Sequence, residues 1–367
     1  MIRRSWPVAF ALAIALPLTP GALAHEPTLT DRVRAAHREA APSAPALAAV
    51  RVRCGARPET AVIGVARADL PTAVLAQGRF NIGSNAKSVL ASLAATFVEE
   101  GRVGWDTTVA EVFKAEAATF HPTLRRATLA QLLAHRSGLP AYTSGRALDA
   151  VKARGADARE RRLSFALQVL RAEPAQAPGA ETLYSNAGYV VAGAMLERIG
   201  ERSFELLAQD RLFRPLGIKA EFGTPPRPEP GHPWGHTAPA KVHISPEPII
   251  PDFLQSAGDV SLSMRDYGLY LREHLCGLQG RQTRLLKPAT VRLLHGGAGE
   301  AGLGWGRLDS AAGRASMHVG GTGAFTTYVV VVPGRNVALA TSVNSGSDEA
   351  GAAARKLLLE LIAAEAK

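Results

Sequence analysis

A serine and a lysine three positions apart, Ser84 and Lys87, stand at the start of an apolar stretch with helical spacing. Residues i and i+3 share one face of a helix, so the lysine amine can reach the serine hydroxyl. The N-terminus of a helix favours negative charge on that oxygen, and serine needs an adjacent base to act as a nucleophile. The pair therefore indicates nucleophilic catalysis, although a helix cap followed by a surface lysine has the same spacing.

A second candidate group is Tyr184-Ser185-Asn186, the only Y-x-N in the chain. A nearby cation favours the phenolate form of a tyrosine, so Tyr184 beside Lys87 could carry protons between a nucleophile and a leaving group. Asn186 could orient Lys87 or hold a substrate carbonyl. The competing interpretation is a loop with a buried tyrosine.

A third candidate is a histidine two residues before a glycine, a pattern that occurs twice, at His318 and at His295. His318 is favoured because it lies near the end of an expected strand. The glycines that follow it, Gly320 and Gly321, would let a substrate approach the backbone closely. His295 instead precedes a Gly/Ala-rich loop.

The elements that must position these groups follow from hydrophobic spacing and turn residues. Strands are expected at both ends of the chain, at 46–54, 60–68, 302–308, 316–319, 325–332 and 337–343. Helices are expected from Ser84 to about Gly101, at 129–134, 163–171 and 189–199, and from Asp348 onward. One antiparallel sheet built from both termini, with a mainly helical subdomain at roughly 101–251 inserted between them, accounts for this order.

The three motifs, in this order and in these elements, resemble the serine β-lactamase and penicillin-binding protein superfamily. The class C-like branch is more similar, with its S-x-x-K, Y-x-N and K-T-G or H-x-G motifs. Further similar stretches cover much of the chain: 132–140 (LLAHRSGLP), 212–218 (LFRPLGI), 256–266 (SAGDVSLSMRD) and 302–306 (GLGWG). The resemblance implies an α+β, β-lactamase/transpeptidase-like fold over 46–367.

The resemblance also implies a role for each candidate residue. Ser84 would be the acylated nucleophile, and Lys87 with Tyr184 would share the work of general base and acid. The backbone N–H groups of Ser84 and Gly321 would form the oxyanion hole. Asn186, His318, Gly320 and Gly321 would contact the substrate. No cofactor is implied.

Two departures from the family pattern bear on the substrate. His318 stands where class C β-lactamases usually have lysine, and Val319 stands where a threonine hydroxyl would bind a substrate carboxylate. These residues favour an amidase or esterase acting on a D-Ala-type peptide or a small ester. A class C-like β-lactamase and a catalytically inactive penicillin-binding-like module are the alternatives.

The N-terminus has the pattern of a cleavable secretory signal. Arg3 and Arg4 precede an apolar run of about 13 residues, too short to span a bilayer comfortably. Ala22 and Ala24 are small residues that a signal peptidase accepts. We therefore expect a signal peptide over 1–24, a lead-in segment over 25–45 and a periplasmic or secreted protein without a stable membrane anchor. The sequence does not separate the Sec from the twin-arginine route.

The chain has two cysteines, Cys54 and Cys276. Export permits a disulfide between them. Sequence does not set the distance between two such remote residues, and two buried free thiols are favoured over one bridge.

Composition narrows the classes of partner. The hydrophobic fraction of 47% and the charged fraction of 20% are ordinary for a folded protein. The formal net charge of +10 comes from scattered arginines rather than from a nucleic-acid-binding block, which indicates a solvated basic surface. His232, His236 and His243 could suggest zinc, but Pro233 and Gly235 break the helix that would align the first two, so loop histidines are expected. The expected partner is a small-molecule or peptide substrate, not nucleic acid.

Overall fold

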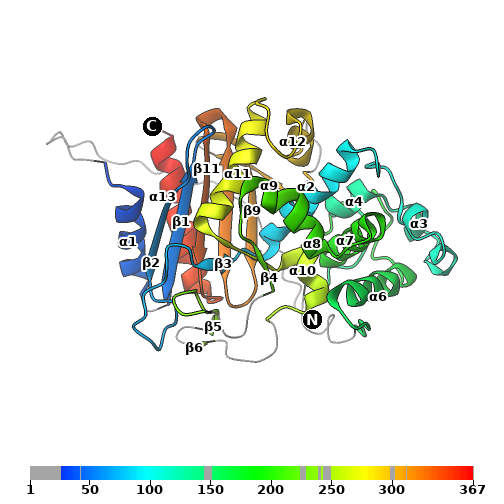
Figure 1. The fold of residues 1–367 in the computed structure, drawn as a ribbon, viewed down its shortest axis with the longest axis horizontal. Coiled ribbons are helices and arrows are strands. Elements are labelled where there is room, and N and C mark those ends of the chain that lie inside the picture. The colour runs from blue at the N-terminus through cyan, green and yellow to red at the C-terminus, as the bar shows by residue number, and fades with distance from the viewer. Residues whose placement is uncertain are drawn as a thin grey trace.

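The computed structural model describes residues 26–41, 43–143, 151–223, 229–238, 241–242, 249–297, 302–310 and 312–366. An antiparallel sheet lies between layers of helices, and a mainly helical region lies beside it (Figure 1). The expected signal peptide over 1–24 lies outside the described residues. None of the helices in the described part is long and apolar enough to cross a membrane.

Within the described ranges, the main sheet has six strands in the order β2-β1-β11-β10-β9-β8, and all neighbouring strands pair antiparallel. Their bounds are β1 Ala46–Val52, β2 Glu59–Gly64, β8 Gly306–Ser310, β9 Gly313–Gly321, β10 Thr326–Val332 and β11 Val337–Val343. Because β1 pairs with β11, the expectation that both chain ends build one sheet is confirmed. A second, small sheet has the strand order β3 (Arg79–Asn81), β7 (Val260–Ser263), β4 (Glu221–Phe222). A third sheet pairs β5 (His236–Ala238) with β6 (Lys241–Val242).

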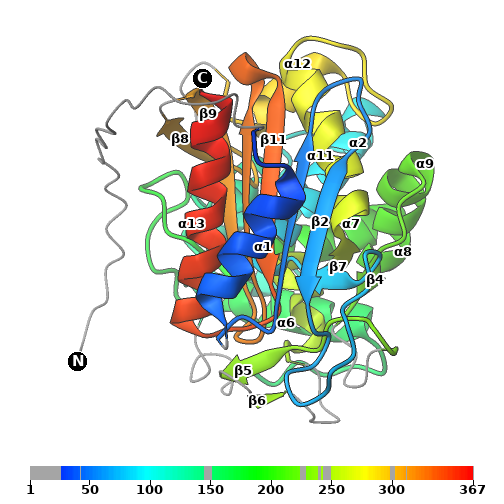
Figure 2. The ribbon, with the colours of Figure 1, turned by 90° about the vertical axis from the view of Figure 1, so that its left-hand side faces the viewer.

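Both faces of the main sheet are buried, because successive side chains along each strand pack into hydrophobic clusters on opposite sides. On one face, Leu47 and Leu339 pack with helices α1 (Leu29–Ala40) and α13 (Asp348–Glu365), which lie side by side over the strands in Figure 2. On the other face, Val50 and Ala338 belong to the larger core with α11 (Met264–Leu278). The period of two in a strand sends successive side chains to opposite faces.

Helix α1 lies within the segment that the sequence indicated only as a lead-in. Thr28 and Asp31 form a reciprocal capping box at its start. Leu29 and Val33 are buried against the sheet, so α1 covers the part of that face that α13 leaves open.

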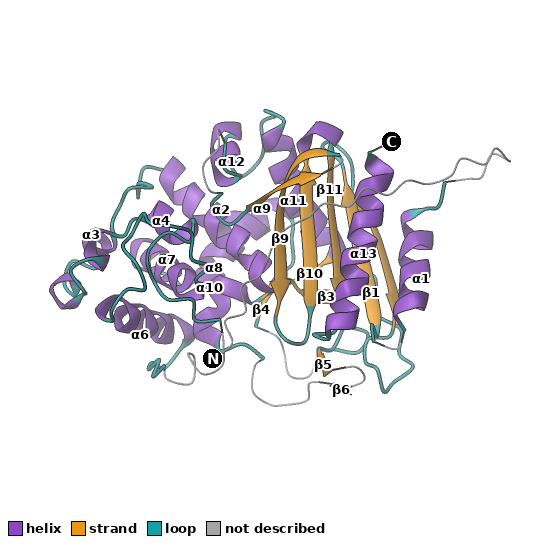
Figure 3. Cartoon of the chain, turned by 180° about the vertical axis from the view of Figure 1, so that it is seen from behind, coloured by secondary structure: helices purple, strands orange, loops and turns teal. Residues whose placement is uncertain are grey.

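The remaining described helices lie mostly on the far side of the sheet from α1 and α13, as Figure 3 shows from behind. They are α2 (Ala86–Glu99), α3 (Val109–Val112), α4 (Leu129–Leu133), α6 (Ala158–Arg171), α7 (Asn186–Gly200), α8 (Phe204–Ala208), α9 (Arg214–Leu216), α10 (Gln255–Gly258) and α12 (Pro288–Leu294). Helix α2 is buried almost all round and contacts α7, α10 and α12. A helix without a polar face belongs in a core, and this one carries Lys87.

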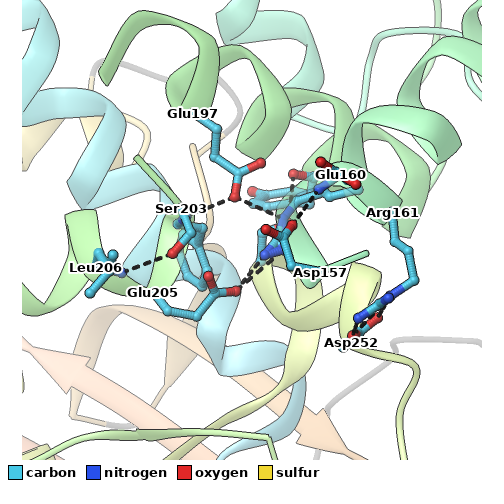
Figure 4. Close-up of polar contacts among 12 residues, drawn as sticks. Asp157, Glu160, Arg161, Glu197, Ser203, Glu205, Leu206 and Asp252 are labelled. Carbon is cyan, nitrogen blue, oxygen red and sulfur yellow. Dashed lines mark hydrogen bonds and ion pairs between the residues drawn. The ribbon is translucent and has the colours of Figure 1, made fainter. Parts of the chain in front are cut away.

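A buried arginine joins three helices of the helical region. The guanidinium of Arg162 on α6 is fully buried and contacts Glu197 of α7 and Glu205 of α8 (Figure 4 shows these carboxylates). Burial raises the pKa of Glu197 to about 7, while the positive charge of Arg162 acts in the opposite direction. Arg161, the neighbouring residue, forms an ion pair with Asp252 (Figure 4). These contacts hold α7 in place, and α7 begins with Asn186.

Cys54 and Cys276 form a disulfide, with Cα atoms 5.1 Å apart. The expectation of two free thiols is therefore wrong. The fold brings the turn after β1 against α11, and only this packing places residues 222 positions apart within bonding distance.

Candidate active site

Ser84 lies in a single 3-10 turn, η1 (Gly83–Asn85), between β3 and α2. The turn depends on two glycines, Gly83 within it and Gly320 on β9, whose backbones lie against each other. Gly83 has a φ of +52°, and a Cβ built there would lie 2.6 Å from the backbone nitrogen of Gly321. A Cβ at Gly320 would lie 2.9 Å from the backbone nitrogen of Ser84. The backbone segments that carry the two N–H groups expected to form the oxyanion hole therefore lie against each other.

A buried amide and carboxylate fix the chain just before Ser84. The side-chain oxygen of Asn81 accepts the N–H of Gly83 at 2.8 Å, and its nitrogen donates to Asp259 at 2.5 Å. Both side chains are almost fully buried. Neither residue was among the sequence candidates. Asp259 lies in the stretch 256–266, and the resemblance of that stretch to the family is the sequence signal that could have identified it.

The buried amine of Lys87 lies among three oxygen atoms. Its Nζ is 2.6 Å from the carbonyl oxygen of Ala257, 2.8 Å from Oδ1 of Asn186 and 3.1 Å from Oγ of Ser84. Nζ donates to all three oxygens, and the carbonyl and amide oxygens can only accept. If the amine lost a proton, its two remaining N–H bonds could stay on Ala257 and Asn186, and its lone pair would be free to accept the hydroxyl proton of Ser84. Burial lowers the pKa of Lys87, while attraction to Tyr184 opposes that shift.

Asn186 and Tyr184 reach Lys87 from the start of α7. Ser185 is the N-cap of this helix, and its hydroxyl accepts the N–H of Gly188. The amide nitrogen of Asn186 donates to the carbonyl of Tyr142 at 3.0 Å, which turns Oδ1 toward Lys87. The ring centroid of Tyr184 lies 4.9 Å from Nζ of Lys87. The side chains named from S-x-x-K and Y-x-N therefore meet.

His318 lies on β9, close enough to Lys87 for the two charges to interact. Burial and repulsion by Lys87 lower the pKa of His318 to about 4, so its imidazole is neutral at physiological pH. Its Nδ1 donates to the carbonyl of Val319 at 3.0 Å, which leaves Nε2 as the basic nitrogen. The Val319 side chain is exposed and apolar.

One further residue at the site, His135, was missed as a candidate. Its ring centroid lies 4.4 Å from that of Tyr184 and 5.0 Å from that of Tyr189. Its backbone φ is +59°, which is uncommon for a residue other than glycine. The stretch 132–140 contains it, but a left-handed backbone at a histidine leaves no pattern in one sequence.

The other histidine candidates lie elsewhere. His295 is buried against His274, with 2.9 Å between ring nitrogens. His236 donates from Nδ1 to the carbonyl of Asn344 and accepts the N–H of Ala68 at Nε2, so its ring is fully used within the core. His243 lies outside the described residues. Among the described residues, no group of three or more His, Cys, Asp or Glu side chains is arranged to hold a metal ion.

The chain is similar to known proteins along most of its length. It is 27% identical to penicillin-binding protein 4 of Amycolatopsis lactamdurans over 299 residues, covering 77% of this chain and 76% of that protein. It is 30% identical to a β-lactamase of Escherichia coli K12 over 141 residues, covering 37% of this chain and 36% of the relative.

Solved structures agree with this similarity. SurE in its structure with D-Leu has a TM-score of 0.72 and 25% identity, with coverage of 92% of this chain and 74% of SurE. The octameric penicillin-binding protein homologue of Pyrococcus abyssi has a TM-score of 0.72 at 19% identity, covering 91% of this chain and 77% of that one, which shows the fold. The family model named Beta-lactamase matches residues 33–364. The chain therefore belongs to the Beta-lactamase family, has the fold of that family and is similar to its serine hydrolases.

Proposed function

We propose that this protein is an exported serine hydrolase that works through an acyl-enzyme on an amide or ester, with a D-Ala-type peptide or a small ester as substrate. The observation that carries the proposal is the placement of Lys87. Its amine is buried, its pKa is lowered, and its Nζ lies 3.1 Å from Oγ of Ser84 between two fixed oxygen acceptors. An amine held in this way is a general base for the serine hydroxyl.

Acylation follows from this arrangement. The Ser84 hydroxyl transfers its proton to Lys87 while Oγ attacks the substrate carbonyl carbon. The carbonyl oxygen becomes an oxyanion, which the N–H groups of Ser84 and Gly321 would stabilise. Collapse of this intermediate breaks the bond to the leaving amine or alcohol. Tyr184, beside Lys87, returns the proton to that leaving group.

Deacylation reverses the roles with water as the nucleophile. A water molecule loses its proton to the Lys87–Tyr184 pair and attacks the acyl carbon. The ester bond to Ser84 breaks, and Oγ recovers a proton. The products are a carboxylic acid and free enzyme, so one water is consumed in each cycle.

Within this substrate class, the residues at 318 and 319 favour an ester or amide over a substrate that must be bound through its carboxylate. His318 is neutral at physiological pH, and the side chain of Val319 offers no hydrogen bond. The similarity to SurE, a structure of which contains D-Leu, supports an acyl group that ends in a D-residue. Similarity to an Aspergillus violaceofuscus protein named unguisins hydrolase, 28% identical over 43% of this chain and 28% of that protein, also supports a hydrolase.

The disulfide supports the export part of the proposal, because such bonds persist in oxidising compartments and are rare in the cytosol. The pattern over 1–24 would direct the chain to the periplasm or the medium.

The test is to incubate the purified mature protein with a fluorophosphonate probe and with four substrate classes. These are a peptide ending in D-Ala-D-Ala, an amide of a D-amino acid, a short nitrophenyl ester and a cephalosporin. We expect labelling on Ser84 and turnover of the ester or a D-peptide. Ser84→Ala should abolish both. Lys87→Ala and Tyr184→Phe should each slow acylation by about 10² or more.

Two outcomes would contradict the proposal. Labelling that survives Ser84→Ala would place the nucleophile elsewhere. A correctly folded wild type that is neither labelled nor active on any of the four classes would favour a binding module without catalysis.

A further inference from the structure

His135 contacts both chain neighbours of Tyr184. Its carbonyl oxygen accepts the N–H of Leu183 at 2.8 Å, and its ring Nδ1 accepts the N–H of Ser185 at 3.0 Å. Its ring also packs on the ring of Tyr184, with 4.4 Å between centroids and 32° between planes. One residue thus fixes the backbone on both sides of Tyr184 and supports its side chain.

The segment that carries His135 is bonded to the Y-x-N motif along its length. The N–H of Asn186 donates to the carbonyl of Ala141 at 2.8 Å, and the hydroxyl of Ser185 donates to the carbonyl of Pro140 at 2.7 Å. Residues 135–142 therefore form a support for residues 183–186, and His135 is the part of it that touches Tyr184.

The backbone of His135 is held in an unfavourable conformation. A φ of +59° brings the Cβ of an L-residue too close to the backbone and persists only where surrounding contacts impose it. Glycine or asparagine would adopt this conformation more easily. A glycine at this position would lack the contacts that the imidazole makes with Ser185, Tyr184 and Tyr189.

The proton state of His135 is fixed by the same contacts. Because Nδ1 accepts the N–H of Ser185, the ring proton lies on Nε2. A second proton on Nδ1 would face that N–H. Burial, with repulsion by Lys87 and His318, lowers the pKa of His135 to about 3. His135 therefore stays neutral at neutral pH and does not carry protons in the reaction.

We propose that His135 is a positioning residue that holds the Tyr184 hydroxyl against the Ser84–Lys87 pair, by clamping residues 183 and 185 and by packing on the Tyr184 ring. The inference rests on the proposed function, because it assumes that Tyr184 transfers protons. It assigns no direct contact between His135 and the substrate.

The test is a double-mutant cycle between His135 and Tyr184, followed by single-turnover acylation with a nitrophenyl ester. His135→Asn keeps an acceptor near the Nδ1 position and tolerates the positive φ, but it loses the ring. His135→Ala loses both acceptor and ring. We expect kcat to fall about tenfold in His135→Asn and further in His135→Ala, with KM nearly unchanged. In the Tyr184→Phe background, both substitutions should change the rate by less than about twofold.

The matched control is His121→Asn, which changes a histidine whose side chain is about 25% exposed and which is paired with Glu173. It should leave kcat and the melting temperature unchanged. Equal rate losses in the wild-type and Tyr184→Phe backgrounds would overturn the inference, because a purely structural role would act independently of the hydroxyl. A wild-type rate in His135→Asn and His135→Ala would also overturn it. If His135→Ala does not fold, His135→Asn alone completes the cycle.

Failure of the proposed function has a different signature. In that case the wild type itself shows no acylation at Ser84, and the assigned role of His135 falls with it. If the wild type is acylated but the cycle is additive, only the positioning role of His135 is overturned.

Discussion

Gly320 on β9 lies directly against the backbone that leads from Ile82 to Ser84. A Cβ added to Gly320 would stand 2.0 Å from the carbonyl oxygen of Ile82 and 2.9 Å from the nitrogen of Ser84. Both atoms belong to the backbone, so neither can swing aside as a flexible side chain would. Strand β9 and the turn that carries Ser84 are therefore packed directly against each other at this residue.

Gly320→Ala should consequently separate β9 from Ser84 and damage the oxyanion pocket. We expect acylation to slow by about 10² or more, the usual effect of losing one such donor. Overpacking should also lower the free energy of unfolding by about 1–3 kcal/mol. Gly334→Ala is the control, since a Cβ there meets nothing within 4 Å. An unchanged acylation rate in Gly320→Ala would show that the two segments are not rigidly coupled.

The pair His318 and Val319 should make the enzyme a poor β-lactamase relative to its esterase activity. A charge-assisted hydrogen bond contributes about 1.5–3 kcal/mol, so its absence should weaken carboxylate-bearing substrates about tenfold or more. We expect the combined change His318→Lys with Val319→Thr to raise the ratio of kcat/KM for a cephalosporin over a nitrophenyl ester. The idea is wrong if the wild type already prefers the cephalosporin, or if the double change leaves the ratio as it was.

Glu197 should make stability fall with rising pH. Its folded-state pKa of about 7 exceeds the ordinary value of 4.5, so the folded protein binds more protons than the unfolded chain between these limits. The contribution of protonated Glu197 to the free energy of unfolding is present in full below about pH 4.5 and is lost as the pH rises through 7. The loss amounts to at most about 3 kcal/mol. Urea unfolding of the wild type and Glu197→Gln at pH 5 and pH 7.5 measures it.

The difference in unfolding free energy between wild type and Glu197→Gln is the informative quantity, because other carboxylates titrate in both proteins. We expect the pH slope of Glu197→Gln to be the more positive of the two. Parallel pH profiles would mean that Glu197 keeps an ordinary pKa beside Arg162.

Loss of the Cys54–Cys276 bond should destabilise the protein without altering the proposed catalytic side chains. Closing a loop of this length restricts the unfolded chain, and such bonds typically contribute about 2–5 kcal/mol. The double change Cys54→Ser with Cys276→Ser should lower the free energy of unfolding by that amount. Dithiothreitol should lower the stability of the wild type equally and leave the double variant unchanged. Destabilisation of the double variant by dithiothreitol would point to an effect unrelated to this bond.

Local patterns were sufficient to place the strands of the main sheet and the helix that follows Ser84, although β8 was expected four residues too early and β9 was expected over only four of its nine residues. The valine-rich segments that form β10 and β11 were predicted within one residue of where they occur, because turns at Pro333 and Asn336 separate them. The first two strands were predicted two to four residues too long at their C-terminal ends. Helix α1 was missed, although Leu29, Val33 and Ala36 recur at helical spacing, because the surrounding Ala/Pro-rich composition favoured a lead-in.

The parts of the site that could not be predicted depend on tertiary contacts. Ala257 supplies a backbone carbonyl to Lys87, and a carbonyl has no residue-type signature. His135 acts from a left-handed backbone conformation that only the folded chain imposes. The pairing of Cys54 with Cys276 depends on the spatial distance between two residues 222 positions apart, and the residues next to each cysteine do not determine that distance.

The disulfide also determines what a protease can do to this protein. The covalent loop from Cys54 to Cys276 encloses Ser84, Lys87 and Tyr184, whereas His318 lies outside it. A single cut anywhere in the loop leaves the two fragments covalently joined through the disulfide. A nicked molecule would therefore migrate as one chain on a non-reducing gel and as two fragments after reduction.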